Sequence, residues 1–130
     1  MNAVLIVDDS ATMRKMLRRV LGQTDLPIDV VLEAADGVDA IQQLVEQPDV
    51  RVVLCDWNMP RLDGARFLAA VRRRRTKEQL AVVLVTTERA EAIFDTISED
   101  EVNAYLQKPL TPSDLRTAIA PYLRAEGEAA

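Results

Sequence analysis

Short apolar runs that alternate with segments of helical periodicity constrain the fold more than any other feature of this chain. Each run places β-branched and other apolar residues at consecutive positions, which is typical of strands buried on both faces of a sheet. Strands of this kind joined by helices require a mostly parallel sheet with right-handed crossovers and helices on both faces. The runs lie at residues 4–7, 30–32, 52–55 and 81–85, with a weaker one at 102–106.

Four helices are predicted between these runs. In the first, apolar residues recur at i, i+3, i+4, i+7 and i+8 from Met13, and Ser10 is a suitable N-cap. The second ends before Pro48, and Asp63 is placed to cap the third. The fourth is indicated by apolar spacing alone, at Ala90, Ile93, Phe94 and Ile97.

A fifth helix follows the last run and has the clearest start. Thr111 stands at the cap, Pro112 at the first helical position, and Asp114 completes the pattern of a capping box. Pro121 lies inside the apolar face of this helix. Because proline removes a backbone donor, the final turn is predicted to bend or fray.

The length of the chain suits one compact domain, which is expected to span residues 1–124. Residues 125–130 are small and polar without a pattern, so a flexible C-terminal tail is expected there. The apolar run at residues 4–7 leads directly into two aspartates, and this disfavours a signal peptide or a membrane span. The protein is therefore predicted to be cytoplasmic, with no membrane partner.

The composition excludes several kinds of chemistry. The chain has no His and one Cys, so a Ser/His or Cys/His nucleophilic pair, a His metal site and an intrachain disulfide are ruled out. The 16 Lys and Arg against 21 Asp and Glu give a net charge of −5, which disfavours nucleic acid as a partner. Two arginine-rich runs, at residues 14–19 and 72–75, are predicted to be solvated helix faces.

Polar residues stand where four of the five predicted strands end. Asp8 and Asp9 follow the first run, Asp56 the third, Thr86 the fourth, and Lys108 lies just past the fifth. Since the carboxyl ends of parallel strands share one edge of a sheet, these residues are predicted to meet in one pocket. Each aspartate alone is explained more simply as a cap of the following turn, so their joint placement is what indicates a functional site.

These residue types predict a cation and a phosphoryl group in the pocket. Three carboxylates repel one another unless a cation shares the site, and oxygen ligands without His or Cys favour Mg²⁺. Three aspartates and one lysine carry a net charge of −2, which Mg²⁺ brings to about zero. One carboxylate can then accept a phosphoryl group whose oxygens are held by Mg²⁺, Lys108 and the Thr86 hydroxyl.

Several short motifs occur in order along the chain, and each is weak alone. They are Val7-Asp8-Asp9-Ser10, Asp36-Gly37, Asp56-Trp57-Asn58-Met59-Pro60 with Asp63-Gly64, Val85-Thr86 and Lys108-Pro109. Together, and at this spacing, they make the chain resemble a response-regulator receiver domain of the CheY type over nearly its whole length. The resemblance implies a flavodoxin-like, doubly wound sheet of five parallel strands in the order 2-1-3-4-5, with five helices in three α/β/α layers.

By position, the resemblance implies a role for each acidic residue of the pocket. Asp56 is the expected phosphoryl acceptor, while Asp8 and Asp9 are the acid pair that positions Mg²⁺. In this family a main-chain carbonyl completes the protein ligands of the metal. The expected metal ligands are therefore Asp8, Asp9, Asp56 and the Asn58 carbonyl oxygen.

The resemblance also implies contacts to the phosphoryl group and a conformational switch. Thr86 and Lys108 are expected to contact the phosphoryl oxygens, and Tyr105 is expected to turn inward when Thr86 moves. Ordinary strand packing is the alternative role for Tyr105. Asn58 and Glu88 occupy the two variable positions that tune self-dephosphorylation in this family.

The implied function is that of a stand-alone receiver in a two-component phosphorelay, a signalling switch and not an enzyme. A histidine kinase is the expected phosphodonor, since the chain has no His of its own. Because the chain ends shortly after the fifth helix, its output is expected to be a protein bound at the face of helix four, strand five and helix five. It is expected to be a monomer when unphosphorylated. Chemotaxis is the leading context, and a phosphorelay shuttle or another single-domain regulator is the alternative.

Two other classes of protein have less support. An aspartyl-nucleophile phosphatase of the haloacid dehalogenase type needs a second Asp two residues after its nucleophile, where this chain has Asn58. An unphosphorylated binding scaffold has no use for the complete set of acids, threonine and lysine.

Leu110 stands where receiver domains commonly have Phe, on the face that usually binds partners, so the identity of the partner stays open.

Overall fold

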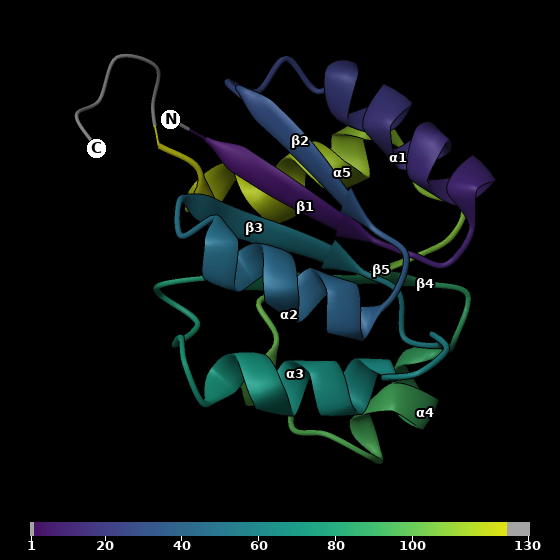
Figure 1. Ribbon diagram of the computed structural model, residues 1–130. Helices are drawn as coiled ribbons and strands as arrows, with labels where there is room; N and C mark the ends of the chain where they lie inside the picture. Colours follow the sequence, from purple (N-terminus) through teal and green to yellow (C-terminus); the bar gives the residue numbers. More distant parts are fainter. Residues whose placement is uncertain (1, 125–130) are drawn as a thin grey trace.

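The computed structural model describes residues 2–124, and the predicted tail at 125–130 lies outside them. Five parallel strands form one sheet in the order β2-β1-β3-β4-β5, as expected for a flavodoxin-like fold (Figure 1). The order places β1 and β3 side by side, although the chain visits β2 between them. The strands are β1 (Ala3–Val7), β2 (Val30–Ala34), β3 (Val50–Cys55), β4 (Ala81–Thr86) and β5 (Ala104–Gln107).

Helices cover both faces of the sheet and complete the predicted three layers (Figure 1). Helices α1 (Ala11–Gly22) and α5 (Pro112–Ile119) pack on one face. The other face carries α2 (Gly37–Glu46), α3 (Gly64–Arg72) and the short α4 (Ala90–Phe94). Within the part of the chain that the structure describes, no helix has the length and apolar character needed to cross a bilayer.

Alternation along the central strands divides the buried residues into two cores. Val4 and Ile6 of β1 contribute to the core under α1 and α5, whereas Leu5 and Val7 contribute to the core under α2, α3 and α4. All residues of β1 and β4 are buried, but β2 and β5 are half-buried because they lie at the edges of the sheet. The consecutive apolar runs in the sequence therefore mark strands covered on both faces.

The predicted caps are confirmed, and two element boundaries differ from prediction. Ser10 and Asp63 accept backbone hydrogen bonds at the starts of α1 and α3, and Thr111 forms the capping box of α5. Helix α4 ends at Phe94, so Ile97 lies in the following turn. Strand β5 begins at Ala104, after the buried Val102.

The last turn of α5 changes type, as Pro121 predicts. The α-helix stops at Ile119, and a 3-10 turn covers Ala120–Tyr122. Proline cannot donate a hydrogen bond from its nitrogen, so the α-helical pattern is interrupted at Pro121. The final turn is closed instead by the Leu123 amide, which donates to the Ala120 carbonyl oxygen at 3.3 Å.

The prediction that both arginine-rich runs are solvated helix faces is wrong for three side chains. Arg72 donates to the carbonyl oxygens of Leu80 and Glu101, both at 2.9 Å, and so ties the end of α3 to the segments around it. Arg75 donates to the carbonyl oxygen of Leu44, at 2.7 Å. Arg14 is also largely buried, with 17% of its side chain exposed. Arginine reaches buried carbonyls through its long apolar stem, and a run of arginines in the sequence does not reveal this.

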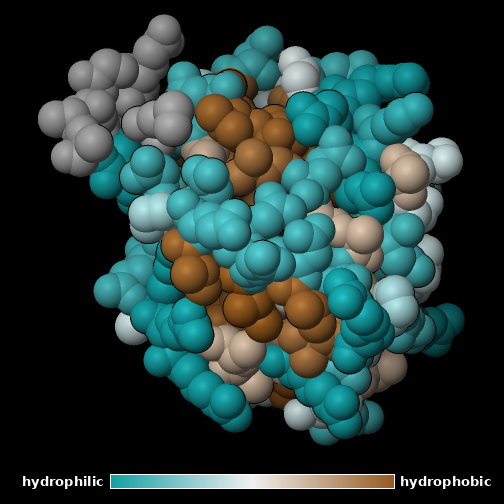
Figure 2. All heavy atoms as spheres, in the orientation of Figure 1, coloured by the Kyte–Doolittle hydropathy of each residue, from teal (hydrophilic) through white to brown (hydrophobic). Residues whose placement is uncertain are grey.

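A groove of about 260 Å³ opens between α2 and α3 on the face shown in Figure 2, where apolar side chains gather. Ile41, Leu44 and Val45 line one wall, and Ala70 and Val71 line the other. These residues belong to the C-terminal halves of the two helices. Since the helices run antiparallel to the strands, the groove lies toward the amino edge of the sheet, away from the predicted polar pocket.

The capping box of α5 provides a test of how the fold is stabilised. Thr111→Ala removes the oxygen that accepts the hydrogen bond of the Asp114 amide, at 3.1 Å. The free energy of unfolding is expected to fall by about 1 kcal/mol, as measured by urea denaturation. The control is Thr117→Ala, which removes an exposed hydroxyl within the same helix and is expected not to destabilise it. Equal effects of the two substitutions contradict the capping interpretation.

Candidate functional site

The carboxyl edge of the sheet brings three aspartates together. Val7 pairs with Cys55 at the ends of β1 and β3, so the residues that follow these strands are neighbours. One carboxylate oxygen from each of Asp8, Asp9 and Asp56 lies within 4.8 Å of the other two. Asp8 is buried, Asp56 is partly exposed and Asp9 is exposed, so the cluster is open to solvent on one side. The structure thus assembles the acidic pocket that the strand ends predict.

Lys108 is the cation of this pocket. Its ammonium nitrogen lies 2.8 Å from Asp8 Oδ2 and 3.7 Å from Asp56 Oδ2. Its side chain is 8% exposed, and that of Asp8 is 2% exposed, so the pair is shielded from water. The segment after β5 is held at this edge because the Lys108 amide donates to the Thr86 carbonyl oxygen at 2.9 Å. The Lys108–Pro109 peptide bond is cis.

The donor set fits a hard divalent cation. One lysine offsets only one of the three carboxylate charges, which leaves mutual repulsion in the cluster. The three aspartates offer oxygen ligands at close range, and oxygen ligands of this kind are those that Mg²⁺ prefers. Asp8, Asp9 and Asp56 are therefore suited to share such an ion.

Backbone contacts orient two of the three carboxylates. Asp8 Oδ1 accepts a hydrogen bond from the Ser10 amide at 2.9 Å, and Asp56 Oδ1 accepts one from the Trp57 amide at 2.7 Å. Each of these carboxylates also faces Lys108 through its other oxygen. In residues 2–124, no hydrogen bond or ion pair holds the carboxylate of Asp9.

Thr86, Glu88 and Asn58 form a connected rim beside the pocket. The Thr86 hydroxyl is buried at the end of β4 and accepts a hydrogen bond from the Glu88 amide at 3.3 Å. The Glu88 carboxylate in turn accepts a hydrogen bond from the Asn58 side-chain amide at 2.8 Å. The loop after β3 and the loop after β4 are thus joined by the side chains of Asn58 and Glu88.

Tyr105 lies next to this rim. Its hydroxyl donates to the Glu88 carbonyl oxygen, and its ring meets Phe94 edge-on with a centroid distance of 6.2 Å. Burial raises the pKa of Tyr105 above its ordinary value, and the charges of Glu91 and Glu88 act in the same direction. The side chain therefore remains a neutral hydrogen-bond donor at neutral pH. The hydrogen bond to Glu88 ties Tyr105 to the segment that begins at Thr86. The packing of Tyr105 as an ordinary strand residue does not require such a bond.

An ion pair fixes the loop after Asp56, and the sequence gives no signal for it. Arg61 has φ of 64° and donates to Asp36 Oδ2 through Nε at 2.7 Å. Asp36 also caps α2, because its Oδ1 accepts the Asp39 amide at 2.9 Å. Where this loop meets α3, a Cβ on Gly64 would lie 2.8 Å from the Trp57 ring, so only glycine fits. The Asp36-Gly37 and Asp63-Gly64 motifs thus shape the loop that carries Asp56.

Cys55 is a buried side chain of β3 with no exposed surface. Burial raises the pKa of its thiol, and the charges of Asp56 and Asp8 raise it further. The thiol therefore stays protonated at neutral pH and contributes to packing and not to chemistry.

Comparisons with known proteins agree with this geometry. A family model described as "Response regulator receiver domain" matches residues 4–120. A chemotaxis protein CheY homolog of Campylobacter jejuni is 40% identical over 116 residues, which cover 89% of this chain and 88% of that protein. Chemotaxis protein CheY1 of Helicobacter pylori is 36% identical, with coverage of 89% and 92%. The solved structure of CheY4 of Vibrio cholerae has a TM-score of 0.77 at 28% identity, with coverage of 95% and 99%.

The Asp36 contacts predict a specific pH dependence of stability. The hydrogen bond from the Asp39 amide lowers the pKa of Asp36, burial opposes this, and Arg61 lowers the pKa further, with a net shift below the ordinary value. Such a carboxylate stabilises the fold above an ordinary pKa of about 4, and the contribution is lost as the pH falls through the folded value. Asp36→Asn is therefore expected to have a lower melting temperature than wild type at pH 7. The difference between the two melting temperatures is expected to shrink toward pH 3.

The control for this experiment is Asp49→Asn, which makes the same change in charge at an exposed position. Its melting temperature is expected to follow that of wild type over the whole pH range. A difference between wild type and Asp36→Asn that stays constant, or that grows as the pH falls, contradicts the assignment of the pKa shift to Asp36.

Proposed function

The chain belongs to the response regulator receiver family, and we propose that it is a signalling switch operated by phosphorylation of Asp56. Receiver domains of this family are signalling switches, and the named relatives are chemotaxis regulators. The observation that carries the proposal is the position of Lys108, buried between Asp8 and Asp56 beside a cluster of three carboxylates. This arrangement supplies an acceptor oxygen, a fixed cation and ligands for a divalent ion.

The acceptor reaction needs a phosphodonor from another protein, and we assign this role to the phosphohistidine of a histidine kinase. The chain contains no His, so it cannot form this donor itself. In the transfer, an oxygen of Asp56 forms a bond to phosphorus, the bond from phosphorus to the imidazole nitrogen breaks, and that nitrogen takes up a proton. A carboxylate is a competent nucleophile for phosphorus when nearby cations balance the charge.

Mg²⁺ is the proposed cofactor, since receiver domains bind it at an acidic pocket and the three aspartates form one here. Its proposed ligands are Asp8, Asp9, Asp56 and the main-chain carbonyl of Asn58. When bound, the ion supplies positive charge that offsets the charge of the phosphoryl oxygens. Lys108 already faces Asp56 and is placed to hold one of these oxygens, and the Thr86 hydroxyl is proposed to donate to another.

The proposed output passes from Thr86 to Tyr105. The two residues are connected through Glu88, whose amide donates to the Thr86 hydroxyl and whose carbonyl accepts from Tyr105. A movement of Thr86 toward a phosphoryl group therefore changes the position of the Tyr105 partner. The affected surface is that of α4, β5 and α5, which we propose as the binding face for a downstream protein. Asn58 and Glu88 flank the acceptor and are proposed to tune its dephosphorylation.

The proposed context is chemotaxis, because the relatives from Campylobacter jejuni and Helicobacter pylori carry that name and span nearly the whole chain. A phosphorelay shuttle is the alternative, which the same site chemistry serves. A phosphatase is disfavoured because Asn58 stands where that chemistry needs a second carboxylic acid. The protein is proposed to act in the cytoplasm, as a monomer before phosphorylation.

Trp57 provides an optical test of the proposal. It is the only tryptophan, and its amide donates to Asp56 Oδ1, so a change at Asp56 alters its surroundings. Mg²⁺ followed by a small phosphodonor such as acetyl phosphate is expected to change the fluorescence of wild type in two steps. Asp56→Asn is expected to lose the second step, which depends on the acceptor oxygen. An unchanged signal in wild type, or the same phosphodonor response in Asp56→Asn, contradicts the proposal.

A further inference from the structure

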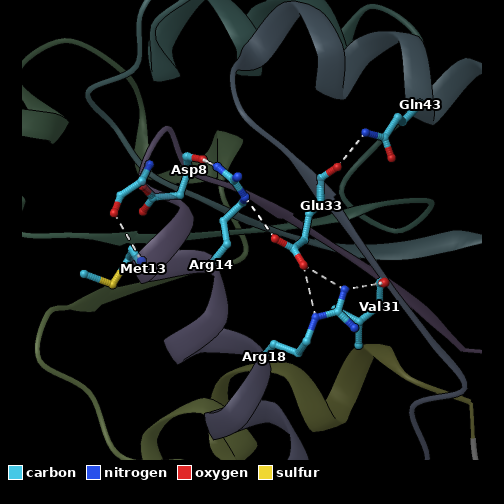
Figure 3. A network of polar contacts seen from close by, with 8 residues as sticks. Asp8, Met13, Arg14, Arg18, Val31, Glu33 and Gln43 are labelled. Carbon is cyan, nitrogen blue, oxygen red and sulfur yellow. Dashed lines mark hydrogen bonds and ion pairs between the residues drawn. The ribbon is translucent and has the colours of Figure 1, made fainter.

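A chain of polar contacts runs from α2 through β2 and α1 to the acidic pocket (Figure 3). The Gln43 side-chain amide donates to the main-chain oxygen of Glu33 at 2.7 Å. The Glu33 carboxylate accepts from Arg14 Nε at 2.9 Å through one oxygen and from Arg18 at 2.9 and 3.1 Å through the other. Arg14 Nη1 then donates to the main-chain carbonyl oxygen of Asp8 at 2.6 Å. The network therefore ends on the peptide bond that joins Asp8 to Asp9.

Asp9 is the one member of the acidic cluster that depends on this peptide for its position. The carboxylates of Asp8 and Asp56 are each held by a backbone amide and face Lys108. That of Asp9 is exposed and has no such contact in residues 2–124. The Cα atom of Asp9 follows this peptide directly, so the orientation of the peptide sets where the Asp9 side chain begins. Arg14 contacts the carbonyl oxygen of the same peptide.

We propose that Arg14 is a positioning residue, which holds the Asp8–Asp9 peptide so that the Asp9 carboxylate meets the cation at the pocket. The inference rests on the proposed Mg²⁺ site and names a residue outside the metal ligands. Partners of this kind, which orient a ligand without touching the metal, typically change metal affinity by about 10- to 100-fold when removed.

The guanidinium of Arg14 is itself held in place. Its side chain is 17% exposed, and two of its nitrogens are engaged in different directions, toward Glu33 and toward Asp8. Burial alone raises the pKa of Glu33, but the hydrogen bonds from Arg18 and Arg14 outweigh it and lower the pKa below its ordinary value. Glu33 is therefore ionised at neutral pH, and its negative charge holds the guanidinium group of Arg14 in place.

Charge and positioning predict opposite results for the removal of Arg14. A positive charge near a cation site opposes cation binding, so its loss strengthens binding if charge alone acts. Loss of a hydrogen bond that orients a ligand weakens binding. Arg18 offers a matched control, because it binds the same Glu33 carboxylate and carries the same charge but does not contact Asp8. The direction of the change therefore separates the two effects.

The experiment measures free Mn²⁺ by electron paramagnetic resonance in the presence of the full chain, followed by displacement with Mg²⁺. Arg14→Ala is expected to weaken the binding of both ions by about 10-fold, and Arg18→Ala is expected to weaken it by less than about twofold. Arg14→Lys keeps the positive charge but not the planar guanidinium group that donates to both Glu33 and Asp8. It is therefore expected to weaken binding at least as much as Arg14→Ala. Melting curves recorded with EDTA identify the folded variants that are compared.

The result that overturns the inference is unchanged or tighter binding in folded Arg14→Ala, or an equal loss in Arg18→Ala. Glu33→Gln is a second variant, which leaves Arg14 in the chain but removes the anion that aligns it, and it is expected to weaken binding in the same direction. Failure of wild type to bind either ion overturns the proposed function and this inference together. Binding by wild type that is unaffected by Arg14→Ala overturns the inference alone.

Discussion

The ion pair of Lys108 with Asp8, extended toward Asp56, is the interaction on which the site depends. Three carboxylates at one edge of a sheet repel one another, and the buried ammonium group offsets part of that repulsion. Both partners are almost fully buried, so loss of Lys108 leaves the buried carboxylate of Asp8 without its ion-pair partner. The parallel sheet brings these residues together across 100 positions of sequence, because β1, β3, β4 and β5 are consecutive in the sheet order.

The two sides of the pocket have different supports. On one side, β2 and the segment after it supply no predicted metal ligand, yet Glu33 of β2 and Asp36 of the following segment hold the two loops that do. Glu33 reaches the loop after β1 through Arg14, and Asp36 reaches the loop after β3 through Arg61. On the other side, Thr86, Glu88 and Tyr105 are linked by single hydrogen bonds at the edge strand β5. One side of the pocket is therefore held by arginine ion pairs and the other by single hydrogen bonds.

The sequence predicts the fold and the five pocket residues because both follow from local patterns. Consecutive apolar residues identify the strands. A polar residue directly after a parallel strand lies at the carboxyl edge of the sheet, and this position does not depend on contacts made by distant side chains. The contacts of Arg14, Arg61 and Arg72 could not be predicted in this way. Each joins segments far apart in sequence, and the reach of a guanidinium depends on which neighbours the packed fold supplies. The fourth helix was predicted, but its end at Phe94 was not, since the apolar spacing through Ile97 continues after the helix ends.

The role of Asp56 as phosphoryl acceptor is tested most directly by the intact mass of the full chain after incubation with Mg²⁺ and a small phosphodonor. A carboxylate that accepts a phosphoryl group forms an acyl phosphate, which hydroxylamine cleaves. The predicted result is a gain of one phosphoryl group that hydroxylamine removes and that Asp56→Asn does not acquire. An unmodified mass under these conditions, or the same gain in Asp56→Asn, contradicts the assignment of Asp56 as the acceptor.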